Sequence, residues 1–239
     1  MPDVIDMNLS AAPAKTEPDG MGHTLTIEVF FDFVCPWCLI GKRNLQVAAS
    51  RLAEARPDVS LKLLWRSHQL LPDTPVGGFD YQAFYLARLG SLDAIARRRA
   101  QVRQAGSTAG VDFNFERISL MPNTAAAHDL VAYAAGHGNE AQVAALIERL
   151  FGAYFMDGED IGNFSVLERL GLDCGLDRQG LAEHLDASPG RHGGSVRQLP
   201  PAAYAISGVP CFVFNGTQAL SGAHPPDTLF EAMLRSVQS

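Results

Sequence analysis

The chain reads Phe30-Phe31-Asp32-Phe33-Val34-Cys35-Pro36-Trp37-Cys38-Leu39-Ile40-Gly41-Lys42 where its pattern changes from strand to helix. The apolar run Leu25–Val34 predicts a short buried strand that ends at Cys35. Helical spacing follows, because apolar residues recur at Leu39, Leu45, Ala48, Ala49 and Leu52. Pro36 suits the first helical turn, where its missing N–H would have no partner. Cys35 and Cys38 are therefore expected on one face of a helix start, close enough for a disulfide.

This position also predicts the chemistry of the two cysteines. The unpaired N–H groups and the positive dipole end of a helix stabilise an anion at its start. We therefore expect Cys35 to be the thiolate of low pKa and the attacking sulfur. Cys38 lies one turn further in and is expected to be the buried partner that resolves a mixed disulfide. The stretch predicts a dithiol/disulfide exchange centre.

Three other interpretations of the cysteine pair compete with this prediction. Half of a zinc site is disfavoured, because Cys174 and Cys211 are solitary and lack metal-ligand spacing. Haem attachment requires a histidine after the second cysteine, where Leu39 stands. Two unreactive core cysteines remain an alternative, although the strand-to-helix context argues against it. The prediction is a redox centre without a metal.

Composition excludes several classes of function. Among 239 residues the net charge is −7, which disfavours nucleic-acid binding. The basic group Arg97-Arg98-Arg99 with Arg103 is interpreted as the solvated face of a helix. No apolar run approaches the ~20 residues of a membrane span, and residues 1–22 lack the apolar segment of a secretory signal. Four cysteines are too few for a disulfide scaffold, so we expect a cytoplasmic protein whose cysteine pair cycles.

The two ends of the chain carry mixed strand and helix patterns. Residues 1–22 are expected to be a disordered tail. Residues 23–78 contain the first strand, a helix to about Ala55 and a strand from Val59 to Trp65, which together form a right-handed βαβ unit. Residues 201–239 contain strands Cys211–Phe214 and Gln218–Ser221 joined at Asn215-Gly216, and a helix from Pro225 or Pro226 to Val237.

Between these ends, residues 79–200 form a predicted helical insertion domain. The first two predicted helices are Tyr81–Arg88 and Leu92–Gln104. A third is capped by Asn123-Thr124 and runs through His128 to Ala135, and a fourth carries the apolar stripe Val143, Ile147, Leu150, Phe151 and Tyr154. Two shorter helices are capped by Ser165 and Asp177. The element order is β-α-β, a helical block, then β-β-α. The predicted fold class is α+β.

This order, together with the cysteine motif, resembles the thioredoxin-like fold of the DsbA-like oxidoreductase family, and more narrowly its FrnE-like, cytoplasmic branch. The resemblance covers about residues 24–237. The matching residues are Phe31–Cys38, Ile40-Gly41-Lys42, Trp65-Arg66, Leu70, Pro72-Asp73, Asn123-Thr124, Ala127-His128, Leu150-Phe151, Tyr154-Phe155, Asp160-Ile161, Gly208-Val209-Pro210 and Ser221-Gly222-Ala223.

The resemblance implies a second active element and a set of partners. The Val209–Pro210 bond would be cis and face the cysteine pair, so that an extended peptide could add beside the disulfide. Pro36 and Trp37 would join Val209 and Pro210 in binding substrate, with Trp37 as a partly exposed lid. The implied partners are cysteine-containing peptides or proteins and small thiols such as glutathione, which is a possible cosubstrate. No other cofactor is implied, and the sequence is silent on oligomeric state.

For each of three further residues, the sequence allows a functional and a structural interpretation. Asp32 either relays a proton or raises the pKa of the Cys38 thiol, or it hydrogen-bonds a backbone group near the strand end. His128 either contacts substrate from a domain cleft or is a structural histidine. Asn123 either caps a helix or lines the same cleft.

Two departures from the family pattern affect the expected activity. Trp37 stands where the strongest oxidants of the wider family carry histidine, which predicts a weaker oxidant that works as a reductase or isomerase. Pro189–Gly194 and Pro200-Pro201 interrupt a helix that relatives carry before Gly208-Val209-Pro210, which predicts a mobile connection and a short helix from Pro200 or Pro201.

Two other function classes are carried as alternatives. The first is a glutathione-dependent isomerase or transferase of the hydroxychromene-carboxylate isomerase and kappa-class group, in which Asn123 or His128 would line the cleft. Those relatives generally keep a serine where Cys35 stands, so the two thiols favour exchange chemistry. The second is a chaperone-like binding module in which the thiols are incidental.

Overall fold

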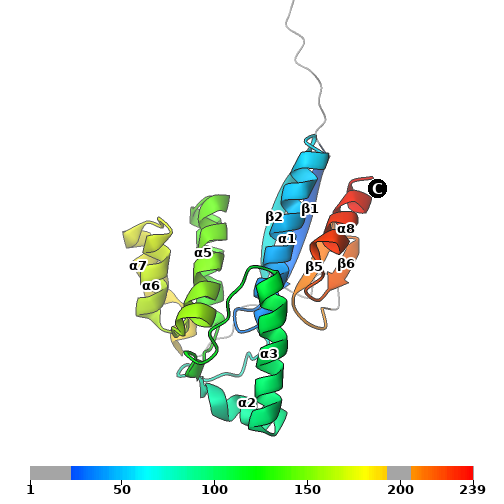
Figure 1. The fold of residues 1–239 in the computed structure, drawn as a ribbon. Coiled ribbons are helices and arrows are strands. Elements are labelled where there is room, and N and C mark those ends of the chain that lie inside the picture. Colours follow the sequence, from blue (N-terminus) through cyan, green and yellow to red (C-terminus); the bar gives the residue numbers. More distant parts are fainter. Residues whose placement is uncertain (1–22, 193–205, 239) are drawn as a thin grey trace, which may run out of the picture.

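A four-stranded sheet forms the centre of the structure (Figure 1), a computed structural model that describes residues 23–192 and 206–238. The strand order is β2-β1-β5-β6. Strand β1 (His23–Phe31) pairs in parallel with β2 (Val59–Ser67) and antiparallel with β5 (Cys211–Phe214), which pairs with β6 (Gln218–Ser221). The predicted βαβ unit with parallel strands and the C-terminal hairpin are both present.

Two helices pack together on one face of this sheet. Helix α1 (Pro36–Ala55) has the predicted bounds, and α8 (Pro226–Gln238) lies beside it in Figure 1. Apolar side chains of alternate β1 residues meet the inward faces of both helices: Leu25, Ile27, Val29, Leu45, Leu52, Leu229 and Met233 are all buried. This alternation follows from the period of two in a strand and of 3.6 in a helix.

The helical block between β2 and β5 contains six α-helices in the described residues. They are α2 (Tyr81–Leu89), α3 (Leu92–Thr108), α4 (Ala125–His137), α5 (Glu140–Gly152), α6 (Phe164–Asp173) and α7 (Arg178–Ala187). A π-helical turn, η1 (Ala153–Asp157), extends α5, and a 3₁₀ turn, η2 (Pro189–His192), follows α7. The five residues of the predicted apolar stripe on α5 and η1 are buried. The predicted α+β fold with a helical insertion is confirmed.

The first strand ends earlier than predicted. Strand β1 stops at Phe31, and the Asp32 carbonyl accepts a hydrogen bond from the Cys35 N–H at 3.2 Å, which closes a turn over residues 32–35. Phe33 and Val34 are buried although they lie in this turn. Because both side chains are apolar and buried, the sequence pattern predicted that the strand continues to Val34.

Three smaller features of the structure also differ from the sequence analysis. Ser165 does not cap α6, because the Asn163 side chain accepts the Ser165 N–H and is itself the cap. A two-stranded sheet of β3 (Phe79–Asp80) and β4 (Leu120–Met121) was not predicted. Strand β2 continues to Ser67, opposite Phe31, whereas the predicted strand ends at Trp65.

The remaining predictions about chain organisation divide between confirmed and untested. Asp177 caps α7 through the Gly180 N–H, and Asn215 and Gly216 take the positive φ angles of 45° and 72° that this hairpin turn requires. The domain limits stay a prediction. The expected tail at residues 1–22 and most of the expected mobile connection, with the short helix from Pro200 or Pro201, lie outside the described residues. In the described part of the chain, no helix is both long and apolar enough to cross a bilayer.

An ion-pair cluster joins α1 to the helical block. Lys42 of α1 donates to Glu148 of α5 at 2.6 Å, and Arg43 donates to the other oxygen of that carboxylate. The Lys42 side chain is only 3% exposed. Burial lowers the pKa of Lys42, whereas Glu148 raises it. The helix that carries both cysteines is thus fixed to the insertion by a charge that has little access to water.

Candidate active site

The cysteine pair begins α1, as predicted. Cys35 is the residue before the helix, with an extended backbone at φ −94° and ψ 107°, and Pro36 opens the first turn. No side chain caps this helix start and no acidic residue lies in its first turn. The N-terminal dipole is therefore available to a negative charge on the Cys35 sulfur. Both cysteines are free thiols in this structure.

The two thiols differ in their surroundings. Cys38 is 3% exposed and Cys35 is 6% exposed. Burial raises the pKa of the Cys38 thiol well above its ordinary value of 9.0, and the hydrogen bond and charge of Cys35 raise it further. The charge of Asp32 adds to this increase, while the Asp32 backbone lowers the pKa. Cys38 is therefore the protonated partner at neutral pH.

A loop before β5 contacts Cys35 from the sheet side. The Cys35 Sγ donates a hydrogen bond to the Val209 carbonyl at 3.7 Å. The Val209–Pro210 peptide bond is cis, Pro210 is buried and Val209 is half-buried. Gly41 permits this approach, because a Cβ there would lie 3.0 Å from Pro210 Cγ. The structure thus brings Val209 and Pro210 to the cysteine pair.

Asp32 and His128 form a buried pair behind the cysteines. Both side chains are 0% exposed, and His128 Nε2 donates to Asp32 Oδ1 at 3.2 Å. The other Asp32 oxygen accepts the Leu70 N–H at 2.7 Å. Asp32 therefore hydrogen-bonds a backbone group and also acts on the pKa of Cys38, so its two interpretations are compatible. His128 packs against the rings of Phe31 and Phe33 instead of facing a cleft.

Asn123 lies in a structural position. Its Nδ2 donates to the Thr74 carbonyl at 2.5 Å, and its Oδ1 accepts the Ala125 N–H at 2.9 Å. It thus joins the loop after β2 to the first residue of α4, where Thr124 is the cap residue. Neither Asn123 nor His128 lines the cavity beside Cys35.

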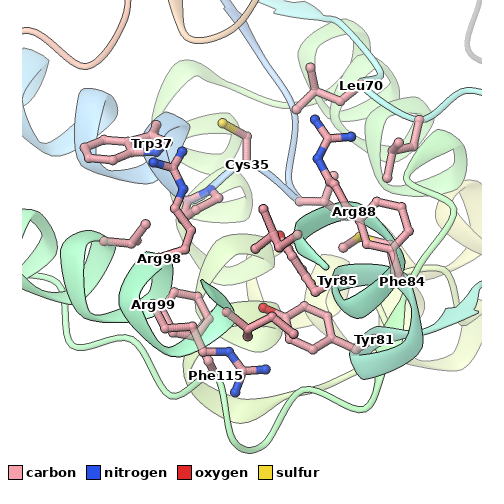
Figure 2. A pocket seen from close by; sticks show the side chains of 17 residues that line it. Cys35, Trp37, Leu70, Tyr81, Phe84, Tyr85, Arg88, Arg98, Arg99 and Phe115 are labelled. Carbon is pink, nitrogen blue, oxygen red and sulfur yellow. The ribbon is translucent and has the colours of Figure 1, made fainter. Parts of the chain in front are cut away.

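A cavity of about 460 Å³, here called the Cys35 cavity, lies on the other side of that thiol (Figure 2). One wall consists of the start of α1 with Cys35 and Trp37, and a second of Leu70 and Leu71 after β2. The remaining wall comes from α2 and α3 and includes Tyr81, Phe84, Tyr85, Ile95 and Val102. Trp37 is half-buried, as predicted. Burial raises the pKa of Tyr85, and the nearby charge of Cys35 raises it further.

Three arginines line the Cys35 cavity: Arg88, Arg98 and Arg99. The Arg98 guanidinium lies over the Trp37 ring at 5.6 Å, and that of Arg99 lies over the Tyr81 ring at 5.3 Å. The interpretation of the basic group as a solvated helix face holds for Arg97 and Arg98, which are exposed, although Arg98 also lines the cavity. Arg99 departs from it, because it is half-buried in the cavity wall, and Arg103 is half-buried and paired with Glu116.

The α2 and α3 residues of this wall were missed in the sequence, although a helical pattern contained them. Ile95, Arg98, Arg99 and Val102 follow i, i+3, i+4, i+7 spacing, which places them on one helix face. Tyr81 and Tyr85 share the same relation on α2. Arg98 and Arg99 within the otherwise apolar face of α3 are the sequence feature that could have indicated a cavity wall.

Comparison with known proteins identifies the family. Residues 26–234 match the model of the DSBA-like thioredoxin domain. The chain belongs to this family. YwbO of Bacillus subtilis (strain 168), an uncharacterized protein, is 26% identical over 222 residues, which span 88% of this chain and 96% of YwbO.

Solved structures of DsbA-like proteins share the fold. The probable DsbA oxidoreductase SCO1869 of Streptomyces coelicolor superimposes with a TM-score of 0.76 at 20% identity, over 90% of this chain and 91% of SCO1869. The cytosolic disulfide reductase DsbM of Pseudomonas aeruginosa, in a structure with GSH, gives a TM-score of 0.60 at 20% identity, over 90% of this chain and all (100%) of DsbM. This DsbA-like chain carries the family's cysteine pair at Cys35 and Cys38.

Two cysteines remain outside this site. Cys211 is buried at the start of β5, and Cys174 is half-buried at the end of α6. Burial raises the pKa of both thiols. Among residues 23–192 and 206–238, no group of three or more His, Cys, Asp or Glu side chains is placed to hold a metal ion.

Proposed function

We propose that this protein is a cytoplasmic thiol–disulfide oxidoreductase of the FrnE-like branch that works in the reductase or isomerase direction. The observation that carries the proposal is the opposite placement of two adjacent thiols. Cys35 lines an open cavity, whereas Cys38 lies behind it at the buried Asp32. This arrangement supports Cys35 as the sulfur that meets a substrate and Cys38 as the sulfur that displaces it.

The exchange proceeds in two displacements. The Cys35 thiolate attacks one sulfur of a substrate disulfide, the substrate S–S bond breaks, and one substrate thiolate leaves. Cys38 then loses its proton and attacks Cys35 Sγ, so that the second substrate thiolate leaves and a Cys35–Cys38 disulfide forms. The substrate gains two electrons and the cysteine pair loses them. Glutathione or a thioredoxin-type protein returns two electrons to the pair.

The neighbouring residues have positioning roles in this scheme. Val209 accepts a hydrogen bond from Cys35 through its carbonyl, and it is placed to align the backbone of a cysteine-containing peptide beside the sulfur. Pro36 and Trp37 line the cavity on the other side of Cys35, and Pro210, which follows Val209, is buried. Asp32 raises the pKa of Cys38 and is our candidate to accept its proton during resolution.

The direction of exchange follows from the motif. Trp37 carries no positive charge that would stabilise a Cys35 thiolate, so the reduced protein is not strongly favoured and the couple is a weak oxidant. Glutathione is the expected small thiol, and DsbM, a cytosolic disulfide reductase of the same fold, has a structure with GSH. Partners are therefore cysteine-containing proteins and small thiols.

The test is reduction of insulin with glutathione, glutathione reductase and NADPH. The wild type is expected to accelerate NADPH consumption, and Cys35→Ser to return it to the uncatalysed rate. Cys174→Ser is the matched control and retains activity, because Cys174 lies at the end of α6, outside the Cys35 cavity. Equal activity of wild type and Cys35→Ser would exclude the proposed function.

A further inference from the structure

The Cys35 cavity is lined by positive charge, although the protein as a whole is negatively charged. The chain carries a net charge of −7, yet the cavity is lined by three arginines and by no acidic residue. In the part of the chain that the structure describes, none of the three guanidinium groups forms an ion pair. Arg103, one turn further along α3, is paired with Glu116 and does not line the cavity. The unpaired positive charge is therefore concentrated where a substrate would lie.

The arginines are placed on both sides of the reactive sulfur. Figure 2 shows the Arg98 guanidinium beside Trp37 and the Arg88 guanidinium below Leu70, with the Cys35 thiol between them in this view. Both are exposed residues, so their head groups can turn toward a ligand. Arg99 lies deeper, over the rings of Tyr81 and Phe115, and its Nε is buried without a hydrogen-bond partner.

The remaining surface of the cavity is apolar and aromatic. Trp37, Phe84, Tyr81 and Tyr85 supply ring faces or edges, and Ile95 and Val102 supply aliphatic area. Such a lining favours a flat apolar group. A volume of about 460 Å³ suits a small molecule.

We propose, on the basis of the oxidoreductase function above, that the Cys35 cavity selects small disulfides that carry a carboxylate and an aromatic or other flat apolar group next to the sulfur. Arg88 and Arg98 bind the carboxylate, since guanidinium groups match its geometry in two parallel hydrogen bonds. Arg99 and the aromatic side chains hold the apolar part. The disulfide bond then lies against Cys35, which lines the same cavity.

Two probes separate charge recognition from thiol reactivity. Dithiobis(nitrobenzoate) is an aromatic disulfide with two carboxylates, and dithiodipyridine is a neutral aromatic disulfide. With either probe the Cys35 thiolate forms a mixed disulfide and releases one aromatic thiol, and Cys38 displaces the second. Both probes meet the same thiolate, so the ratio of their rates cancels any change in its pKa. The probes are reduced and the cysteine pair is oxidised.

The decisive variant is Arg88→Gln with Arg98→Gln. We expect the rate ratio, anionic over neutral, to fall about tenfold, as for the loss of one hydrogen bond to a charged group. Arg97→Gln is the matched control, because Arg97 is exposed on the same helix outside the cavity, and its ratio should equal that of the wild type. For the wild type, added salt should slow only the anionic probe.

The outcomes distinguish this inference from the function it rests on. An unchanged ratio in the double variant, or an equal slowing of both probes, would overturn charge recognition in the cavity. A salt response shared by both probes in the wild type would overturn it without reference to any variant. The wild type should release aromatic thiol from either probe in a fast phase, and loss of this phase in Cys35→Ser assigns it to Cys35. If the fast phase with both probes survived in Cys35→Ser, the oxidoreductase function itself would fail.

Discussion

Cys35 and Cys38 are one helical turn apart, yet they face two different environments. On the Cys35 side lies a cavity with three arginines, partly exposed aromatic rings and access to solvent. On the Cys38 side lie Asp32 and His128, both fully buried and hydrogen-bonded to each other. Under the function proposed above, the substrate meets Cys35 from the cavity, and Cys38 attacks the mixed disulfide from the interior side.

The two sides also differ in what a substitution should change. The exposed cavity residues Arg88 and Arg98 are in contact with water, so their loss affects binding more than folding. The interior groups are buried polar atoms whose partners cannot be replaced by water.

The largest effect is expected for Cys38→Ser. Without the resolving thiol, the first displacement still occurs and the mixed disulfide at Cys35 accumulates. We expect catalytic turnover to be abolished and a stoichiometric adduct of the disulfide substrate to appear by intact-mass spectrometry. Cys35→Ser should form no such adduct in the same time. A Cys38→Ser protein that stays unmodified would show that Cys35 is not the sulfur facing the substrate.

The next effect concerns stability, through Asp32→Asn. The carboxylate accepts hydrogen bonds from His128 Nε2 and the Leu70 N–H, and an amide can accept only one of them. Loss of a charge-assisted hydrogen bond from this buried pair should lower the free energy of unfolding by about 2 kcal/mol. Arg98→Gln, on the cavity side, should change it by less than about 0.5 kcal/mol. Chemical denaturation measures both, and equal losses would remove the contrast between the two sides.

Much of this site could be predicted from local sequence signals. The limits of α1 follow from Pro36 and from the apolar spacing after it, and the hairpin follows from Asn215-Gly216. These signals work because the responsible interactions lie within one or two turns of chain. The position of Cys35 just before the helix and of Cys38 one turn inside it also follows from this local pattern.

The cavity itself could not be predicted, since it depends on tertiary placement. The Arg98 and Arg99 side chains become cavity residues only because α3 packs beside the start of α1. His128 was assigned to a cleft or to the core because its spacing allows both, and only the packing of α4 behind Asp32 decides this. The β3–β4 pair, with two residues in each strand, is too short to leave a periodic signal.

A pH titration of Cys38 sharpens the comparison further. The difference in thiolate ultraviolet absorbance between Cys35→Ser and the Cys35→Ser/Cys38→Ser double variant isolates Cys38. Because burial, the first cause of its raised pKa, persists without Cys35, no thiolate should form below pH 9.0, its ordinary value. Adding Asp32→Asn removes a like charge, so the titration should move to lower pH. Adding Arg98→Gln, on the cavity side, should leave it in place.

The smallest effect is expected where α1 meets the Val209–Pro210 loop, at Gly41. A Cβ in Gly41→Ala would lie 3.0 Å from Pro210 Cγ and 3.1 Å from the Phe212 ring, so the loop must shift slightly. Strain from this overpacking is opposed by the better helix propensity of alanine, and we expect stability to change by less than about 1 kcal/mol. The Val209 carbonyl that accepts the Cys35 hydrogen bond moves with the loop, so the rate of insulin reduction should still fall about twofold, equivalent to about 0.4 kcal/mol.

Gly136→Ala on α4 is the matched control for that substitution. Its Cβ would meet no atom within 4 Å, so it gains helix propensity without strain and should leave the reduction rate unchanged. If Gly41→Ala and Gly136→Ala behaved alike in stability and rate, the loop would not constrain Cys35. The sulfur would then be held only by its own helix and cavity, and the sheet side would have no part in aligning a substrate.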